Sequence, residues 1–216
     1  MCSSDLMVAE LADRAGLPKP RVYVSPAAQP NAFATGRNPR HAAVAVTEGL
    51  LTQCPPEEVR GVLAHEMAHI RNRDILIGSV AAAVATGISF VANMALFAGM
   101  FGGGDDEDGP SPFVAILLAI LAPMAATVLQ MALSRSREFE ADRVGAHIAG
   151  DPEPLARALE RLDRISQVTP FDIAPAQASA YIVNPLTGRQ VSFARLFLTH
   201  PPVEERVARL RAMGAA

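Results

Sequence analysis

The chain has 216 residues, half of them hydrophobic, and a formal net charge of −3. This length allows one good-sized domain, or a smaller domain with membrane segments. The basic residues are dispersed and form no electrostatic footprint for nucleic acid, so nucleic-acid binding is excluded. Two cysteines, Cys2 and Cys54, are too few for a disulfide framework, which favours a catalytic portion facing a reducing cytosol.

The N-terminal part predicts an amphipathic helix followed by a small sheet. Its first residues lack the basic and apolar regions of a secretory signal; Leu6, Leu11 and Ala15 lie near one helical face, and Gly16 is a plausible stop. Alternation and turn residues predict short strands at 21–25, 31–35 and 42–46. The last two, joined by a Gly-Arg-Asn-Pro turn, form a small hairpin or meander.

Pro55-Pro56 followed by Glu57-Glu58 predicts the start of a helix, because proline and acidic residues both suit the first turn. This helix contains the sequence HEMAH. His65 and His69, four residues apart, project from one face and can bind one ion, while Glu66 lies about 100° round the helix. Neutral imidazole suits Zn²⁺, and a carboxylate beside a zinc-activated water can take its proton and pass it to a leaving amine.

The alternative is that Glu66 is a solvated helix residue and the two histidines are partly buried polar groups. A third ligand decides between these interpretations.

Two windows without charged residues follow, 75–104 and 109–134. Each is longer than the roughly 20 residues needed to cross a bilayer core. They predict a transmembrane helical hairpin, Ile75 to about Ala98 and Phe113 to Leu133, with an acidic turn at 102–112. Arginines flank both outer ends, so the positive-inside rule predicts that these ends are cytoplasmic. The alternative is a long core hairpin of a soluble helical protein.

Three further helices are predicted beyond the hairpin, at 134–150, 152–166 and 203–213. Candidates for a third ligand on or near them are Glu138, Glu140, Asp142, His147 and His200. His69 lies about six residues before the first span and Glu138 about five after the second, roughly 9 Å and 7.5 Å along a helix, so an antiparallel hairpin brings them to one height. Glu138 and Asp142 share a helix face, Glu140 points away, and His147 is too far along. We therefore assign Glu138 as the third ligand and Asp142 as the acceptor that orients a ligand histidine.

HEMAH, a membrane hairpin and then SRSREFEAD resemble the HtpX family of membrane-bound zinc endopeptidases, heat-shock-associated proteases of bacteria and archaea. NAFATGRNPRHAAVAVTEGLL before the site and THPPVEERVARL near the end are also similar to that family, so the resemblance covers nearly the whole chain. It implies one zinc ion bound by His65, His69 and Glu138, with Glu66 as the catalytic carboxylate. It also implies a gluzincin-type, zincin-like fold, mainly α with a small β-sheet (α+β), interrupted by the transmembrane hairpin.

The resemblance further implies quality control of damaged membrane proteins. We expect residues 1–74 and 135–216 to form the two parts of the peptidase domain, with the hairpin at 75–134 between them. The expected partners are unfolded or membrane protein substrates and the lipid bilayer, without nucleic acid. The expected location is the inner (plasma) membrane, multi-pass, with the catalytic part cytoplasmic. Family members usually carry two more membrane helices before the residues aligned with Leu6 onward, and we expect this sequence to be a truncated one.

Several other residues have two interpretations. His200 caps the last helix or stabilises an oxyanion from the rim of the cleft, and the two roles are compatible. The strand that contains Asn31, Ala32, Phe33 and Ala34 is either a plain sheet strand or the edge that pairs with an extended substrate; we favour the second, since backbone pairing tolerates many sequences.

Less specific signals remain along the chain. Asn72 and Asp74 are expected to be hydrated, although they could help to fix the end of the metal helix. His41 is expected to be a polar turn residue. The stretch 167–198 is long for a connector and is a candidate lid or cleft wall.

Two rival functions remain. The first is a CAAX prenyl-protease-like specificity with the same zinc chemistry, but the sequence lacks the further membrane helices expected to enclose a lipidated substrate. The second is a membrane chaperone or scaffold with a structural zinc. Glu66 argues against it, because a structural site needs no general base and usually closes its fourth position.

Overall fold

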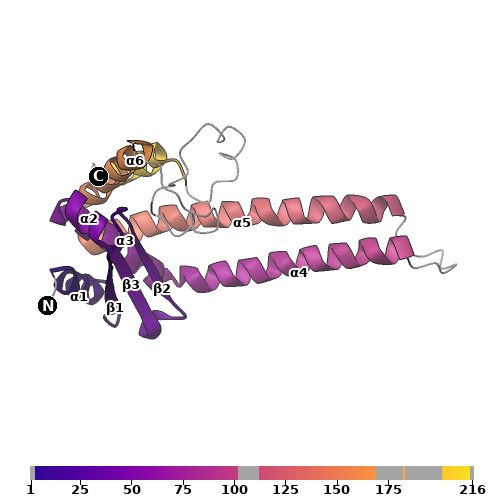
Figure 1. Ribbon diagram of the computed structural model, residues 1–216, viewed down its shortest axis with the longest axis horizontal. Helices are drawn as coiled ribbons and strands as arrows, with labels where there is room; N and C mark the ends of the chain where they lie inside the picture. Colours follow the sequence, from indigo (N-terminus) through magenta and orange to yellow (C-terminus); the bar gives the residue numbers. More distant parts are fainter. Residues whose placement is uncertain (1–2, 102–111, 169–181, 183–200, 215–216) are drawn as a thin grey trace. The chain divides into compact units, whose positions relative to one another are not determined.

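The computed structural model describes residues 3–101, 112–168, 182 and 201–214. They fall into two compact units, Met1–Leu76 with Arg135–Ala216, and Ile77–Ser134. The described part is mainly helical with one small sheet, which confirms the predicted fold class (Figure 1). The elements of the first unit up to the metal helix are α1 (Ser3–Ala15), β1 (Arg21–Ser25), β2 (Ala32–Gly36), the short 3-10 helix η1 (Pro39–His41), β3 (Ala42–Thr47), α2 (Glu48–Gln53) and α3 (Pro56–Asn72). After them come α4 (Asp74–Phe101), α5 (Pro112–Ala149), α6 (Glu153–Val168) and α8 (Val203–Gly214).

The sheet has the strand order β1-β3-β2. Strands β2 and β3 are antiparallel and form the predicted hairpin. The alternative of a meander is wrong, because β1 pairs with the other side of β3 in parallel. Strand β3 is therefore central, and its residues Ala42, Val44 and Val46 are buried. Strand β2 is left as an edge of the sheet.

Helix α1 ends at Ala15, and Gly16 follows in the left-handed conformation with φ 67°, as the sequence predicts. Its buried face consists of Val8, Leu11, Ala12 and Ala15. The placement of Leu6 on this face is wrong, since its side chain is 58% exposed. Leu6 and Leu11 are five positions apart, which is about 140° round a helix, whereas Val8 has the spacing of three, four and seven to the other buried residues.

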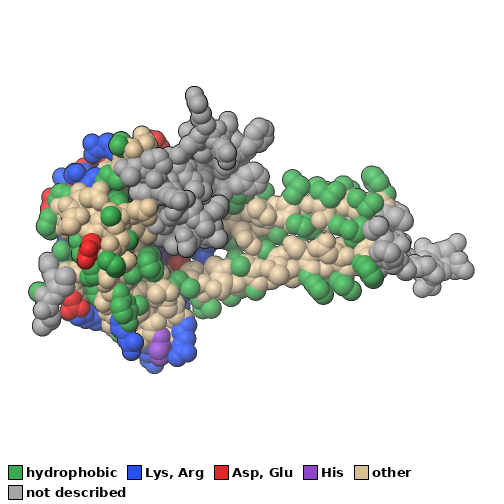
Figure 2. Space-filling view, in the orientation of Figure 1, with side chains coloured by type: hydrophobic (Ala, Val, Ile, Leu, Met, Phe, Trp, Pro, Cys, Tyr) green, Lys and Arg blue, Asp and Glu red, His purple; other side chains and the backbone are tan. Residues whose placement is uncertain are grey.

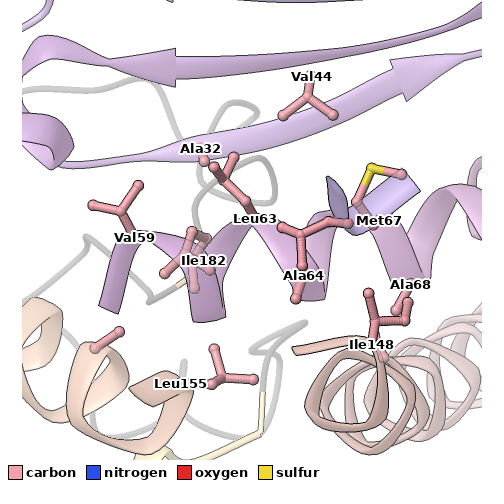
Figure 3. Close-up of a cluster of buried hydrophobic side chains, with 14 of the residues drawn as sticks. Ala32, Val44, Val59, Leu63, Ala64, Met67, Ala68, Ile148, Leu155 and Ile182 are labelled. Carbon is pink, nitrogen blue, oxygen red and sulfur yellow. The ribbon is translucent and has the colours of Figure 1, made fainter. Parts of the chain in front are cut away.

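Helix α3 is the centre of the hydrophobic core, between the sheet and the helices that follow the hairpin (Figure 3). Leu63 points towards Ala32 of the sheet, whereas Ala64 and Ala68 face Leu155 and Ile148 on the opposite side (Figure 3). Because α3 is enclosed on both sides, almost every side chain from Val59 to Ala68 is buried, including the polar ones of the HEMAH sequence. Buried polar groups need hydrogen-bond partners, so the elements packed around α3 must supply partners for its polar side chains.

Helices α4 and α5 carry the two predicted apolar spans, and α5 runs on without a break into the first unit. Within the described residues, these are the two helices long and apolar enough to cross a membrane. Only 6% of each apolar window is buried, and large side chains such as Phe90 and Val91 are about two thirds exposed, at 65% and 66%. Core helices of a soluble protein would be mostly buried, so that alternative is not supported. Residues 102–111 of the predicted acidic turn lie outside the described residues.

Candidate metal centre

His65 and His69 lie on one face of α3 with their Nε2 atoms 3.1 Å apart. Their rings are nearly perpendicular, at 87°, with centroids 4.6 Å apart. This follows from the helix, because residues four positions apart lie one above the other. His65 is only 1% exposed. The two nitrogens therefore converge on one point within the protein.

Glu138 reaches the same point from α5. One carboxylate oxygen lies 3.7 Å from His65 Nε2, and the other lies 3.7 Å from His69 Nε2. Among the described residues, these three form the one group of histidine, cysteine and acidic side chains arranged to hold a metal ion. Helix α5 comes close here because residue 145 is glycine: a Cβ there would lie 2.9 Å from the Cα of His65.

The Nδ1 atom of each histidine faces a carboxylate. Asp142 Oδ1 lies 3.0 Å from Nδ1 of His65, and Asp74 Oδ2 lies 2.7 Å from Nδ1 of His69. Such carboxylates set the tautomer and the orientation of an imidazole, so that Nε2 presents its lone pair. The expectation that Asp74 is simply hydrated is wrong, since it is 8% exposed and bonded to His69. The left-handed turn at the end of α3 places it there.

Arg206 of α8 is 1% exposed and lies behind this cluster. Its Nε and one terminal nitrogen donate to the two oxygens of Asp142, at 2.8 and 2.7 Å, and the other donates to the Ile182 carbonyl at 2.9 Å. The same guanidinium lies 3.7 Å from Glu138. Burial by itself would raise the pKa of Asp142, but the charge and hydrogen bonds of Arg206 lower it to about 2. Asp142 therefore stays anionic behind His65.

The sequence interpretation did not include Arg206. The signal was present, because Val203, Val207 and Leu210 mark the inner face of the last helix and Arg206 falls on that face.

Glu66 is 5% exposed, and one of its carboxylate oxygens accepts a hydrogen bond of 2.8 Å from the backbone N–H of Ala34. Burial raises the pKa of Glu66, and the nearby charge of Glu138 acts in the same direction, against the lowering effect of the two histidines. A carboxylate with a raised pKa is better suited to exchanging protons near neutral pH.

The surroundings of His69 favour its charged form, whereas those of Glu66 favour its neutral form. Burial disfavours the charged form of His69, but the hydrogen bond that its Nδ1–H donates to Asp74 and the charges of Glu138 and Glu66 outweigh this and raise its pKa to about 9. The surroundings of the two histidines therefore attract a cation.

The residues present fit a zinc ion. With zinc–ligand distances of about 2.0–2.2 Å, tetrahedral donors are about 3.3–3.5 Å apart, and the separations here are 3.1, 3.7 and 3.7 Å. Two imidazole nitrogens and one carboxylate form a three-ligand set, which leaves a fourth position open, as catalytic zinc sites do.

Residues 5–214 match peptidase family M48. The chain belongs to this family. The M48 match covers nearly the whole chain, including both histidines and Glu138, and family M48 is zinc-dependent. The predicted resemblance to membrane-bound zinc peptidases is thereby confirmed.

The chain is similar to several proteins described as Protease HtpX homologs. It is 56% identical to the protein of Ralstonia pickettii, over 96% of this chain and 72% of the relative. It is 54% identical to that of Persephonella marina, over 96% and 73%, and 55% identical to that of Desulfatibacillum aliphaticivorans, over 94% and 66%. The chain thus spans about two thirds to three quarters of the length of these relatives.

A solved structure shares the M48 fold. The crystal structure of S. mikatae Ste24p superimposes with a TM-score of 0.64, over 97% of this chain and half of that one, at 21% identity. This likeness supports the fold, in which a small sheet and helices surround the metal helix.

The residues that the sequence analysis excluded as metal ligands, Glu140 and His147, lie away from the metal ligands, as predicted. Glu140 is exposed and pairs with Arg143, and His147 is exposed, with its Nδ1 2.8 Å from the Arg143 carbonyl. His41 ends η1 at the surface, as expected for a turn residue. His200 and nearly all of the stretch 167–198 lie outside the described residues, so the proposed oxyanion and lid roles stay predictions.

Of the predicted substrate strand, Ala32, Phe33 and Ala34 lie in β2, and Asn31 lies directly before it. Asn31 is buried and bonded to Thr47, which fixes the start of the strand. Phe33 is 38% exposed. The edge of the sheet therefore runs past Glu66, with the Ala34 amide in direct contact with it.

Proposed function

We propose that this protein is a membrane-bound, zinc-dependent endopeptidase that cleaves misfolded or damaged proteins, including membrane proteins, on the cytoplasmic side of the inner (plasma) membrane. The observation that carries the proposal is the convergence of His65, His69 and Glu138 beside the buried carboxylate of Glu66. Sequence identity of 52–56% to HtpX homologs favours this function over a prenyl-protease-like specificity or a chaperone with a structural zinc.

In this proposal, His65, His69 and Glu138 hold one zinc ion, and Asp142 and Asp74 orient the two imidazoles. Zinc supplies Lewis acidity, which polarises the scissile carbonyl and acidifies a water molecule. Glu66 takes the proton of that water and returns it to the leaving amine.

Substrate binding is proposed along the edge of the sheet at Asn31, Ala32, Phe33 and Ala34. An extended chain can add to a free edge through its backbone groups, which suits unfolded substrates of many sequences. The Ala34 N–H donates a hydrogen bond to Glu66, so this bond directly joins the proposed substrate edge to the proposed general base. A substrate paired with β2 would lie within reach of the base.

The direct test compares the wild type with Glu66→Gln, purified in a mild detergent and loaded with zinc. Both proteins should bind one zinc per chain, and only the wild type should cleave an unfolded protein. Glu66→Gln preserves the hydrogen bond from Ala34, because the Gln amide oxygen can accept it, so a loss of cleavage reports on the base. If the variant cleaves at the wild-type rate, Glu66 is not the general base.

The proposed side of the membrane needs its own test. A reporter that folds only in the cytosol, fused after the last residue, should be active in cells. An inactive fusion at normal membrane yield would contradict a cytoplasmic catalytic part.

A further inference from the structure

Arginines outside the metal centre differ in whether acidic side chains neutralise them. Several are in ion pairs, such as Arg60 with Glu10 and Arg161 with Glu58. Among the exposed arginines that no acidic side chain pairs with in the described part of the chain, four lie at the β2–β3 connection or the end of α3: Arg37, Arg40, Arg71 and Arg73. We call these four arginines the basic rim. The sequence from 14 to 47 contains no Asp or Glu, so its positive charge has no neighbour along the chain to balance it.

A small, partly open pocket lies between the β2–β3 connection and the end of α3, and two arginines of the basic rim, Arg37 and Arg73, line it. Arg37 and Asn38 line it from the connection, and Arg73 lines it from the end of α3. The remaining wall includes the apolar side chains of Ile75 and Leu76. Figure 2 shows basic side chains gathered at the end of the sheet where the β2–β3 connection lies in Figure 1. The pocket thus combines cationic donors with an apolar wall.

The apolar wall belongs to the first turn of α4, the helix with the first apolar span. Ile75 and Leu76 are 39% and 48% exposed. If α4 enters a bilayer, Arg73 must lie where the hydrocarbon gives way to the headgroups, because it immediately precedes the helix. The pocket would then open at the depth of lipid phosphates.

The backbone of Arg73 has an uncommon conformation. With φ 57°, Arg73 is the one residue other than glycine, among those described, in the left-handed region. At the end of a helix this conformation favours Gly or Asn, because a Cβ atom crowds the backbone there. A disfavoured residue at such a position indicates that its side chain is needed.

We propose that this pocket binds the phosphate headgroup of an anionic phospholipid. Arg37 and Arg73 contact the phosphate, Ile75 and Leu76 cover the first methylene groups of an acyl chain, and Arg40 and Arg71 add attraction from outside. Basic residues next to membrane helices commonly recognise anionic lipids in this way. His69 also lines the pocket, so the lipid would bind against a residue of the metal centre. The inference depends on insertion of α4 in a membrane and not on peptidase activity.

The test uses the full chain in a neutral detergent, titrated with phosphatidylglycerol or phosphatidylcholine and followed by native mass spectrometry. The variant is Arg37→Gln with Arg73→Asn, in which Asn suits the left-handed backbone. The matched control is Arg157→Gln with Arg164→Gln, which removes the same charge from exposed positions on α6. If each arginine contributes about fivefold in affinity, the pocket variant should bind phosphatidylglycerol about 25-fold more weakly than the wild type, and the control should bind within about twofold of the wild type.

Several results would overturn the proposal. The proposal fails if the wild type binds both lipids equally, or if the two double variants lose equal affinity. Competition by millimolar inorganic phosphate with the same affinity as the lipid would indicate a site for free anions. Unchanged lipid binding with a raised KM for acidic peptides in the pocket variant would indicate a substrate subsite instead. Equal zinc content and equal unfolding temperatures establish that the variants are folded, and the lipid preference of the wild type tests the proposal without any variant.

Discussion

Replacing Arg206 by Met should destabilise the unit that holds the metal centre by about 3–5 kcal/mol, the usual cost of breaking a buried ion pair by removing one partner. Arg206 donates two hydrogen bonds to Asp142 and one to the Ile182 carbonyl, and it is 1% exposed. Without it, Asp142 is a carboxylate that is 3% exposed and has lost its counterion. Burial then dominates, and the pKa of Asp142 rises from about 2 to above its ordinary value.

Thermal unfolding of the zinc-loaded protein in detergent, followed by circular dichroism, measures this loss. At about 2–4 °C per kcal/mol, the unfolding midpoint should fall by roughly 6–20 °C. The double variant Arg206→Met with Asp142→Asn should recover part of the loss, because it removes both charges.

The sign of the pH dependence follows from the lowered pKa of Asp142 in the folded wild type. Its contribution to stability is present above the unfolded value of 3.8 and is lost as the pH falls towards 2. In Arg206→Met the folded pKa is raised instead, so the defect should shrink at acidic pH. A midpoint within about 2 °C of wild type for the single variant would refute the reasoning, as would a double variant whose loss is the sum of the two single losses.

Two further predictions concern the metal centre. Gly145→Ala should weaken zinc binding and cost about 1–3 kcal/mol of stability, because the new methyl group would meet the backbone of His65 at 2.9–3.0 Å and push α5, with Glu138, away from α3. Gly87→Ala is the matched control, since nothing lies within 4 Å of a Cβ at that position. Equal zinc affinities in the two variants would contradict the packing argument. Zinc affinity should fall as the pH drops below about 9, the raised pKa of His69, because zinc must then displace a proton. Up to a tenfold loss per pH unit is expected in a competition titration with a chelator, and a flat profile between pH 6 and 8 would show that His69 does not bind the metal. With the metal removed by the chelator, the sign reverses: protonated His69 stabilises the fold below its unfolded pKa of 6.5, and this stability is lost as the pH rises through about 9.

The elements around the site were largely predictable, because their signals are local. Pro56 with the acidic residues after it begins α3, and the spacing of HEMAH places both histidines on one face. The two uncharged windows likewise appear as long helices. The parallel pairing of β1 with β3 was not predictable in this way, because either edge of a two-stranded hairpin offers the same free backbone groups to a third strand.

By itself, the sequence determined the helix that carries His65 and His69, the two apolar helices, and Glu138 as the carboxylate to test, since periodicity, charge and spacing along a helix carry this information. Only the tertiary structure decided which groups surround the ligands. The contact of Ala34 with Glu66 joins residues 32 positions apart, and that of Arg206 with Asp142 joins residues 64 positions apart. Partners of buried polar groups are chosen by the packing of the whole core, because each such group must be satisfied wherever the chain brings a donor or an acceptor within reach. No local pattern specifies that choice, which is why the pairing of Asp74 with His69 and that of Arg206 with Asp142 emerged only from the folded chain.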